Sequence, residues 1–364
     1  MSRIVVVGAG LLGSAVADEL AALGSAVTVI ESGRPASGTS GNSFAWINAQ
    51  DKSPAPYFEL NFDGVRAYPA LAAELGGDWY HGGGDIAIGR GAGAPKLTER
   101  IERHRAAGYA VRELDRAGIA ELEPALELPV DGDLVAAHYP DEAWIDAPAL
   151  VERRLARATE RGAQVRASTP VVGLEVSGGR ITGVRTDEGL LAADTVVIAA
   201  GAATQALAAQ VGVAVTMAPS PGILVTATLA DRSVRHVIHA GDVALRPDRP
   251  GQIVLSSREV DAGLDPAMRA IQPDAEETRQ ILARGERILP ELRDAGVEQA
   301  RVGIRSVATD GFPVAGFAPS IPNLYLLVTH SGATLAPVLG RMVALELNGQ
   351  LDERLAAYRP ARFA

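Results

Sequence analysis

Three glycines near the N-terminus have the spacing of a dinucleotide-binding turn. Gly8, Gly10 and Gly13 follow an apolar run at residues 4–7 and open a helical pattern. In such a turn the first glycine permits the tight bend, the second lets backbone N–H groups approach a pyrophosphate, and the third lets the helix pack on the strand. The phosphates then lie at a helix N-terminus, which favours an anion. The sequence therefore predicts a bound dinucleotide.

Glu31 indicates which dinucleotide this is. A second apolar run, residues 26–30, ends at this acidic residue. A carboxylate in that position accepts hydrogen bonds from both ribose hydroxyls of an adenosine, and its charge repels a 2′-phosphate. NADP is therefore disfavoured. We expect Leu11, Leu12 and Ser32, which neighbour these motif residues, to contribute to the same cofactor site.

Composition and charge exclude several classes of function. The chain has 364 residues, 47% of them hydrophobic and 4% aromatic, as in a soluble α/β protein of roughly two domains. A net charge of −10 argues against a nucleic acid or an anionic membrane as partner. With no cysteine there is no disulfide, thiolate metal site, dithiol relay or cysteinyl cofactor link. No metal-ligand spacing is found either, so we expect a bound organic group to supply the chemistry.

The chain also gives an expectation about location. It contains no run of about 18 apolar residues, and it enters its first strand at Ile4 without a charged and then apolar leader. We therefore expect no integral membrane segment, no signal peptide and a cytoplasmic protein. The sequence leaves a homo-oligomer open.

The apolar patterns change twice along the chain, which predicts two interleaved domains. Residues 194–200 are nearly all apolar, as in a parallel strand buried on both faces, whereas residues 217–258 alternate as antiparallel strands do. We predict an α/β protein in which a Rossmann-like dinucleotide-binding domain is interrupted by a largely antiparallel α+β substrate-binding domain. The first comprises residues 1–80, 146–216 and 300–364, and the second comprises residues 81–145 and 217–299. Helices are expected at residues 57–75, 96–107, 149–161, 276–289 and 332–348.

Six ordered motifs resemble the FAD-dependent D-amino-acid-oxidase-like superfamily, which includes glycine oxidase, sarcosine oxidase and D-amino-acid dehydrogenases. Besides the N-terminal glycine motif they are GTSGNS at 38–43, STPV at 168–171, DTVVIAAGA at 194–202, GIRSVATDGFPVAG at 303–316 and THSGATLAP at 329–337. A terminal Arg362-Phe363 extends the resemblance over nearly the whole chain.

The resemblance implies that FAD is bound noncovalently. It places the adenosine on Glu31, the pyrophosphate at the first helix and the adenine against the backbone at Val171. The loop 38–43 would line the diphosphate and ribityl chain. The other cofactor residues expected on this basis are Thr39, Ser40, Asn42, Ala200 and Gly201. Residues 37–43 contain no histidine, which speaks against a covalent link from that loop.

The turn before the last long helix has a physical reading of its own. A glycine-led helix start near Gly332 offers unpaired N–H groups and the positive end of a helix dipole. Aimed at N1 and C2=O of a flavin, these groups would stabilise the negative charge of its reduced form. Gly332, Thr334 and Leu335 are the residues expected there. The alternative is an ordinary turn and cap, with Pro337 in the first helical turns.

Arg305 and His330 are the candidates for the reacting end of the site. In the resembling amino-acid oxidases an arginine at the position of Arg305 clamps the substrate carboxylate, and a planar guanidinium matches a carboxylate through two hydrogen bonds. The alternative is a salt bridge, for which Asp310 is available. His330 lies in a turn where relatives vary, so it either bonds substrate or flavin or satisfies the loop backbone.

Three further residues are candidates for substrate contact. His239 lies near the position where some relatives place a substrate-facing tyrosine, and its alternative is a structural histidine. Trp46 either flanks the isoalloxazine or belongs to the core. Ala244 stands where glycine oxidase has a second pocket tyrosine. Because alanine lacks the bulky polar side chain of that tyrosine, glycine is in doubt as the substrate, and a larger or differently shaped substrate side chain is indicated.

The reaction that this resemblance implies is oxidation of the C–N bond of an amino acid or amine. Hydride passes to flavin N5, an imine forms, and oxygen or a quinone accepts the electrons. No protein base is required if the amine binds deprotonated, so catalysis is mostly orientation and electrostatics. The alternatives are oxidation of a 2-hydroxy acid or of a secondary amine such as sarcosine or proline, and a non-catalytic FAD-carrying subunit of a larger complex. Monooxygenation with NADPH lacks a second nucleotide fingerprint.

Overall fold

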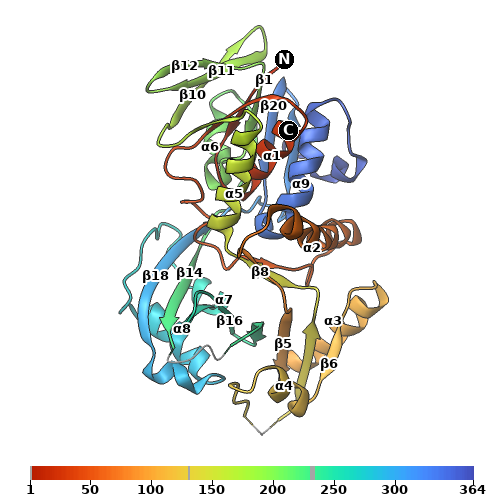
Figure 1. The fold of residues 1–364 in the computed structure, drawn as a ribbon, viewed down its shortest axis with the longest axis vertical. Coiled ribbons are helices and arrows are strands. Elements are labelled where there is room, and N and C mark those ends of the chain that lie inside the picture. Colours follow the sequence, from red (N-terminus) through yellow and green to blue (C-terminus); the bar gives the residue numbers. More distant parts are fainter. Residues whose placement is uncertain (1, 130–131, 230–233) are drawn as a thin grey trace.

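The upper part of Figure 1 contains a six-stranded sheet, and the N-terminal strand is one of its inner strands. In this computed structural model, which describes residues 2–129, 132–229 and 234–364, its strand order is β19-β20-β13-β1-β2-β9. The strands are β1 (Arg3–Val7), β2 (Ala26–Ile30), β9 (Gln164–Arg166), β13 (Thr195–Ile198), β19 (Val314–Ala318) and β20 (Ile321–Val328). All neighbours are parallel except the edge pair β19–β20. The predicted Rossmann-like sheet is confirmed.

Both faces of this sheet are buried. Ile4 and Val6 belong to a core shared with helices, whereas Val5 and Val7 belong to a core shared with a three-stranded antiparallel sheet. The helices are α1 (Leu11–Ala22), α5 (Ala147–Glu160) and α9 (Gly332–Leu347), and the small sheet is β10 (Val171–Ser177), β11 (Arg180–Thr186) and β12 (Gly189–Ala192). Because successive side chains of a strand point to opposite faces, a sheet covered on both sides needs the unbroken apolar runs seen in the sequence.

The turn between β1 and α1 is tightly packed. Gly8 has a φ of +106°, and a Cβ there would lie 2.5 Å from the Ala199 carbonyl oxygen. A Cβ on Gly13 would lie 1.9 Å from the carbonyl oxygen of Gly8 itself. The structure thus gives these two glycines the bending and packing roles that their spacing predicts.

The second region is an eight-stranded sheet, in the lower part of Figure 1. Its order is β18-β14-β17-β16-β15-β5-β7-β6. The strands are β5 (Asp85–Arg90), β6 (Arg112–Leu114), β7 (Leu134–Tyr139), β14 (Ser220–Thr228), β15 (Val237–Ala240), β16 (Val243–Pro247), β17 (Gln252–Ser256) and β18 (Gly296–Arg305). Only the β5–β15 pair is parallel, and it joins the two sequence blocks that the interruption predicts. Residues 300–305, assigned from sequence to the dinucleotide-binding domain, pair with β14 in this sheet.

The remaining elements flank the two sheets. Helices α3 (Gly93–Ala106), α4 (Arg116–Leu122), α7 (Arg258–Asp261) and α8 (Glu276–Glu286) accompany the eight-stranded sheet, and α2 (Ala55–Leu75) packs against α9. Short strands β3 (Trp46–Ile47), β8 (Ala143–Ile145) and β4 (Tyr80–His81) form a small sheet of their own. Helix α6 (Thr204–Ala209) follows β13. No helix in the described part of the chain has the length and apolar character needed to cross a bilayer.

Gly13→Ala tests the close contact between the turn and helix α1. The added methyl group meets backbone at 1.9 Å, so strand and helix must separate, and we expect a loss of about 1–3 kcal/mol in unfolding free energy together with weaker FAD retention. Urea unfolding and the ratio of flavin to protein absorbance measure the two effects. Gly93→Ala is the matched control, because nothing lies within 4 Å of a Cβ at that position. Equal behaviour of the two variants would contradict the packing role.

Candidate active site

A cavity of about 1030 Å³ runs from the β1–α1 turn to the start of α9. That volume is at the upper end for small-molecule sites, so it has room for an extended cofactor and a substrate. Predicted site residues that line it are Gly8, Gly10, Leu11, Leu12, Glu31, Ser32, Thr39, Ser40, Asn42, Trp46, Val171, Ala200, Gly201, His239, Arg305, His330, Gly332 and Thr334. Segments far apart in the sequence therefore meet at one site.

Glu31 is held in place at the end of β2. Its carboxylate accepts hydrogen bonds from the backbone N–H groups of Ala9, at 2.9 Å, and Gly33, at 2.8 Å. The hydroxyl of the exposed Ser32 donates to it at 3.0 Å. The two backbone donors orient the carboxylate, while the exposed hydroxyl bond is one that a ribose hydroxyl can replace. This geometry fits the adenosine end of a dinucleotide, and Val171 at the start of β10 lines the same cavity.

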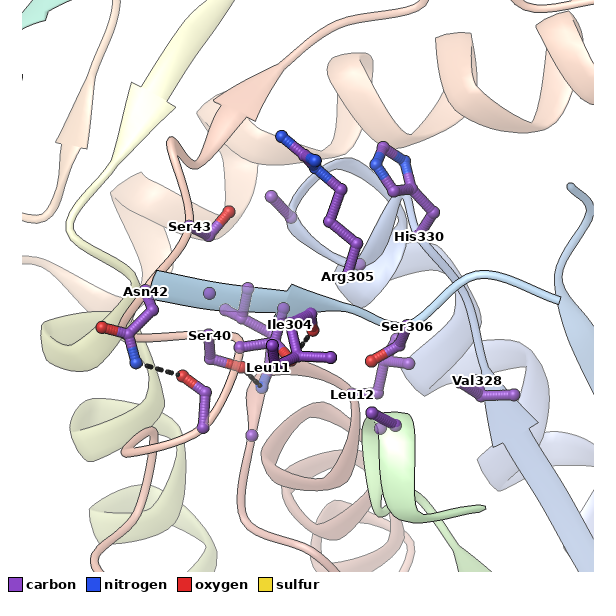
Figure 2. A pocket seen from close by; sticks show the side chains of 18 of the residues that line it. Leu11, Leu12, Ser40, Asn42, Ser43, Ile304, Arg305, Ser306, Val328 and His330 are labelled. Carbon is purple, nitrogen blue, oxygen red and sulfur yellow. Dashed lines mark hydrogen bonds between the residues drawn. The ribbon is translucent and has the colours of Figure 1, made fainter. Parts of the chain in front are cut away.

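The loop 37–43 packs on both α1 and β18. Leu11 N–H donates to Ser40 Oγ at 3.0 Å, and the Thr39 hydroxyl donates to the Ile304 carbonyl at 2.6 Å. The Asn42 amide donates to the Ser37 and Gly38 carbonyls of its own loop, and Figure 2 marks one of these bonds. The N-cap residue of α1, Gly10, supplies no side-chain cap, so the N–H groups of the first turn other than that of Leu11 can receive an anion. These loop side chains line the cavity and also hold its wall together.

The start of α9 forms the other end of the cavity. Helix α9 begins at Gly332 without a side-chain cap, and the Thr334 hydroxyl exchanges hydrogen bonds with the backbone of Asn48. Leu335 does not line the cavity, since its side chain is fully buried and its N–H donates to the Ser331 carbonyl at 2.9 Å, so its part in the cofactor site stays a prediction. Gly13 does not line the cavity either, and it packs under the turn in the role that its spacing predicts.

Arg305 is the last residue of β18 and projects into the cavity (Figure 2). One terminal nitrogen donates to the Pro221 carbonyl at 2.9 Å and the other donates to the carboxylate of Asp261. Asp310, the partner considered from sequence, pairs with Arg362 at 2.6 Å. Each terminal nitrogen of Arg305 carries a second N–H. One N–H on each terminal nitrogen therefore remains for a ligand carboxylate.

His330 lies beside Arg305, and Figure 2 shows the two side chains projecting in the same direction. Desolvation by the surrounding protein lowers the pKa of His330 to about 4. The positive charges of Lys52, Arg305 and Arg258 act in the same direction. The imidazole is therefore neutral near pH 7, able to donate one hydrogen bond and accept another.

Trp46 and His239 form an aromatic wall of the cavity. Their ring centroids are 4.0 Å apart, with a 35° angle between the planes. His239 Nδ1 lies 2.6 Å from a carboxylate oxygen of the buried Asp85, and Trp46 Nε1 donates to the buried Glu142 at 2.8 Å. His239 thus has a structural partner, Asp85, on one side and borders the cavity on the other, and its contact with substrate stays a prediction.

Gln50 joins the two carboxylates behind this wall. Its amide nitrogen donates to Asp85 at 2.9 Å and to Glu142 at 3.1 Å. Tyr109 also donates to Glu142, at 2.7 Å. Burial, and then the nearby charge of Asp85, raise the pKa of Glu142 well above its usual range. The aromatic wall therefore has a hydrogen-bonded and nearly solvent-free support.

Ala244 lies next to this wall without entering the cavity. It pairs with His239 across strands β15 and β16, so both side chains project from the same sheet face. It is not among the residues that line the cavity. A substrate contact by Ala244 stays a prediction.

Several functional candidates escape the sequence analysis. Lys52 and Arg258 line the cavity, and Asp85, Glu142 and Asp261 support its walls. Arg258 and Asp261 are the first and last residues of α7, Asp85 begins β5, and the other two lie in loops. None of the five belongs to a motif with recognisable spacing. The only local signal is Ser257, whose hydroxyl caps α7 and so positions Arg258 at its first residue.

Comparison with known proteins decides the family. A family model described as FAD dependent oxidoreductase matches residues 3–345. The chain belongs to this family. It is therefore an enzyme that uses FAD, and the predicted family resemblance is confirmed.

Individual members of the FAD-dependent oxidoreductase family match over nearly their full lengths. Glycine oxidase of Pseudomonas aeruginosa is 30% identical over 375 residues, which cover 99% of this chain and 98% of that protein. The structure of glycine oxidase from Geobacillus kaustophilus matches with a TM-score of 0.88 and 24% identity over 100% of both chains. Iminodiacetate oxidase from Chelativorans sp. BNC1 matches with a TM-score of 0.85 and 25% identity, covering 98% of this chain and 99% of that one.

The low pKa of His330 is open to measurement. Because the unfolded chain binds this proton with the ordinary pKa of about 6.5 and the folded protein with a pKa of about 4, falling pH destabilises the fold within that interval. We expect the His330 ring to titrate near pH 4 by NMR, assigned with His330→Asn. The variant should lose less thermal stability than the parent between pH 7 and pH 5. A midpoint near 6.5 would contradict the assignment.

Proposed function

We propose that this FAD-dependent enzyme oxidises the C–N bond of an amino acid or related amine and releases an imine. The observation that carries the proposal is the guanidinium of Arg305, which faces the cavity with unused N–H groups on both terminal nitrogens. Relatives whose names specify amino-acid oxidation cover nearly the whole chain, which supports the same reaction class.

The cofactor residues proposed here form one continuous surface. Glu31 and Val171 hold the adenosine, the uncapped start of α1 receives the diphosphate, and the loop 37–43 borders the ribityl chain. The second uncapped helix start, at Gly332, favours negative charge on the ring. FAD bound in this way is noncovalent and supplies the acceptor for the two electrons that leave the substrate.

The substrate is oriented by residues of this chain. Arg305 fixes the carboxylate, and because Asp261 and the Pro221 carbonyl hold the guanidinium, little side-chain freedom is lost on binding. The neutral His330 beside it offers a hydrogen bond without adding a charge. Trp46 and His239 form an aromatic wall of the same cavity. No general base is assigned, because an amine that binds deprotonated needs only orientation and a complementary field.

Anaerobic reduction tests the reaction class. The holoenzyme is mixed with D-amino acids, L-amino acids, N-methyl amino acids and 2-hydroxy acids, and loss of the flavin absorbance is followed. We expect reduction by one class of amine that carries a carboxylate. Reduction by hydroxy acids alone, or by none of these compounds, would refute amine oxidation. Reoxidation with oxygen or with a soluble quinone then identifies the electron acceptor.

Arg305→Lys separates a carboxylate clamp from a structural ion pair. Lysine keeps a positive charge next to Asp261 but lacks the two-nitrogen fork. We expect substrate affinity to fall by about 1.5–3 kcal/mol, measured as the increase in the half-saturating concentration for flavin reduction, with little change in melting temperature. Arg287→Lys, in the exposed Arg287–Asp242 pair, is the control. Unchanged affinity in Arg305→Lys would reassign this arginine to the fold.

A further inference from the structure

Among the cations that line the cavity, Lys52 and Arg258 have no carboxylate partner in the part of the chain that the structure describes, and Arg269 bonds only backbone carbonyls. Lys52 precedes α2 and Arg258 begins α7, and both line the cavity together with Arg305. Neither side chain makes an ion pair in the described chain. The Lys52 ammonium lies over the Tyr57 ring, 5.9 Å from its centroid.

The carboxylates closest to these cations are engaged elsewhere. Asp51 pairs with Arg100 at 2.8 Å, and Asp261 binds both Arg305 and the N–H of Ile223. Glu259, next to Arg258 in the chain, points to Arg284 at 4.0 Å. Glu142 is buried and accepts bonds from its aromatic neighbours and Gln50. The charges of Asp51 and Glu142 raise the pKa of Lys52, but less than burial and the charge of Arg258 lower it, and neither acid makes an ion pair with Lys52 or Arg258 in the described chain.

The two cations also lie close enough to repel each other. The charge of Arg258 lowers the pKa of Lys52, after the larger effect of desolvation, and both charges act on His330. This happens in a chain whose net charge is −10, so the positive cavity wall does not follow from a generally basic surface. Placing unpaired like charges together costs free energy that a bound anion recovers.

Arg305 does not already account for this positive charge. Its own charge is balanced by Asp261, and its free N–H groups suffice for one carboxylate. An amino acid with a single carboxylate on Arg305 would leave Lys52 and Arg258 unneutralised in the same cavity. A substrate with a second anionic group would neutralise them.

We propose that Lys52 and Arg258 bind a second carboxylate of the substrate, so that the enzyme acts on amines carrying two carboxylates. This rests on the proposed function, and it narrows the substrate to a dicarboxylic amine. The second carboxylate stands either on the side chain of an acidic amino acid or on the substituent of an imino diacid. This second carboxylate takes no part in bond making or breaking, and its binding only positions the amine. Lys52 and Arg258 are specificity residues in this scheme.

Binding of unreactive analogues tests the site without turnover. Succinate and butyrate have the same number of carbons but differ in one carboxylate, and calorimetry with the holoenzyme gives the affinity of each. We expect succinate to bind about tenfold more tightly or better, which corresponds to about 1.4 kcal/mol. Lys52→Gln and Arg258→Gln should each remove most of this preference for succinate. Lys52→Arg keeps the positive charge and should keep the preference.

The exposed residues Lys96 and Arg279 provide the matched controls. Lys96→Gln and Arg279→Gln remove the same charges from outside the cavity and should leave the succinate preference unchanged. An equal loss in these controls would mean that only the net charge matters, and would overturn the proposal. Loss of FAD from Lys52→Gln or Arg258→Gln would overturn it too, since the cations would then serve the cofactor.

Matched substrates extend the test to the reaction. Aspartate is compared with alanine, in both configurations, and iminodiacetate with N-methylglycine, by anaerobic flavin reduction. The Lys52→Gln and Arg258→Gln variants should raise the half-saturating concentration of the dicarboxylate about tenfold or more and leave that of the monocarboxylate unchanged. Equal changes for both members of a pair would refute the second-carboxylate site.

The two proposals fail in different ways. Monocarboxylic amines that reduce the flavin, without any preference for succinate, would leave the amine oxidation standing and refute the dicarboxylate site. Tight binding of succinate through Lys52 and Arg258, with no reduction by any amine, would refute the oxidation while the anion site stands. The aspartate and iminodiacetate arms also tell whether the second carboxylate is on the side chain or on the nitrogen.

Discussion

The contact between strand β18 and the loop 37–43 joins the two regions of this protein. The Thr39 hydroxyl donates to the Ile304 carbonyl at 2.6 Å, and Arg301 donates to the Gly41 carbonyl at 2.9 Å. A Cβ on Gly303 would lie 2.1 Å from the Asn42 carbonyl oxygen, so strand and loop meet backbone to backbone. Because β18 belongs to the eight-stranded sheet and the loop packs on α1, this contact places Arg305 above the dinucleotide crevice.

Electrostatic asymmetry is the second constraint on the site. Asp85, Glu142 and Asp261 lie in the walls of the cavity with nearly all of their surface buried, and each is engaged by hydrogen bonds that orient a cavity residue. Lys52, Arg258 and Arg305 line the cavity itself. Burying a carboxylate costs desolvation free energy unless the group is hydrogen-bonded. The hydrogen bonds of these three acids offset that cost and hold His239, Trp46 and Arg305 in position. The free positive charge is left for a ligand.

Much of the fold is predictable because its signals are local. The glycine turn, the apolar strands and the long helices follow from backbone sterics and from periodicities of two and 3.6 residues. Helix α9 begins at Gly332, as predicted, and α8 ends at Glu286, three residues before the predicted Leu289. The cofactor residues next to these local signals line the cavity, because the same local structure positions them. Leu335 does not line it, because the helix turns its side chain into the core and its N–H bonds within the helix.

By itself, the sequence determined the dinucleotide turn, the acidic residue at the end of β2, the interleaved architecture and the candidate arginine, because each depends on neighbours within a few residues or on an ordered set of motifs. Only the tertiary structure decided the partners. Arg305 pairs with Asp261 and not with Asp310. His239 is hydrogen-bonded to Asp85. Lys52 and Arg258 line the same cavity. Pairings between residues far apart in the chain depend on how sheets and loops pack together. The periodicity of the sequence reports only on local structure, so it does not predict which distant residues become partners.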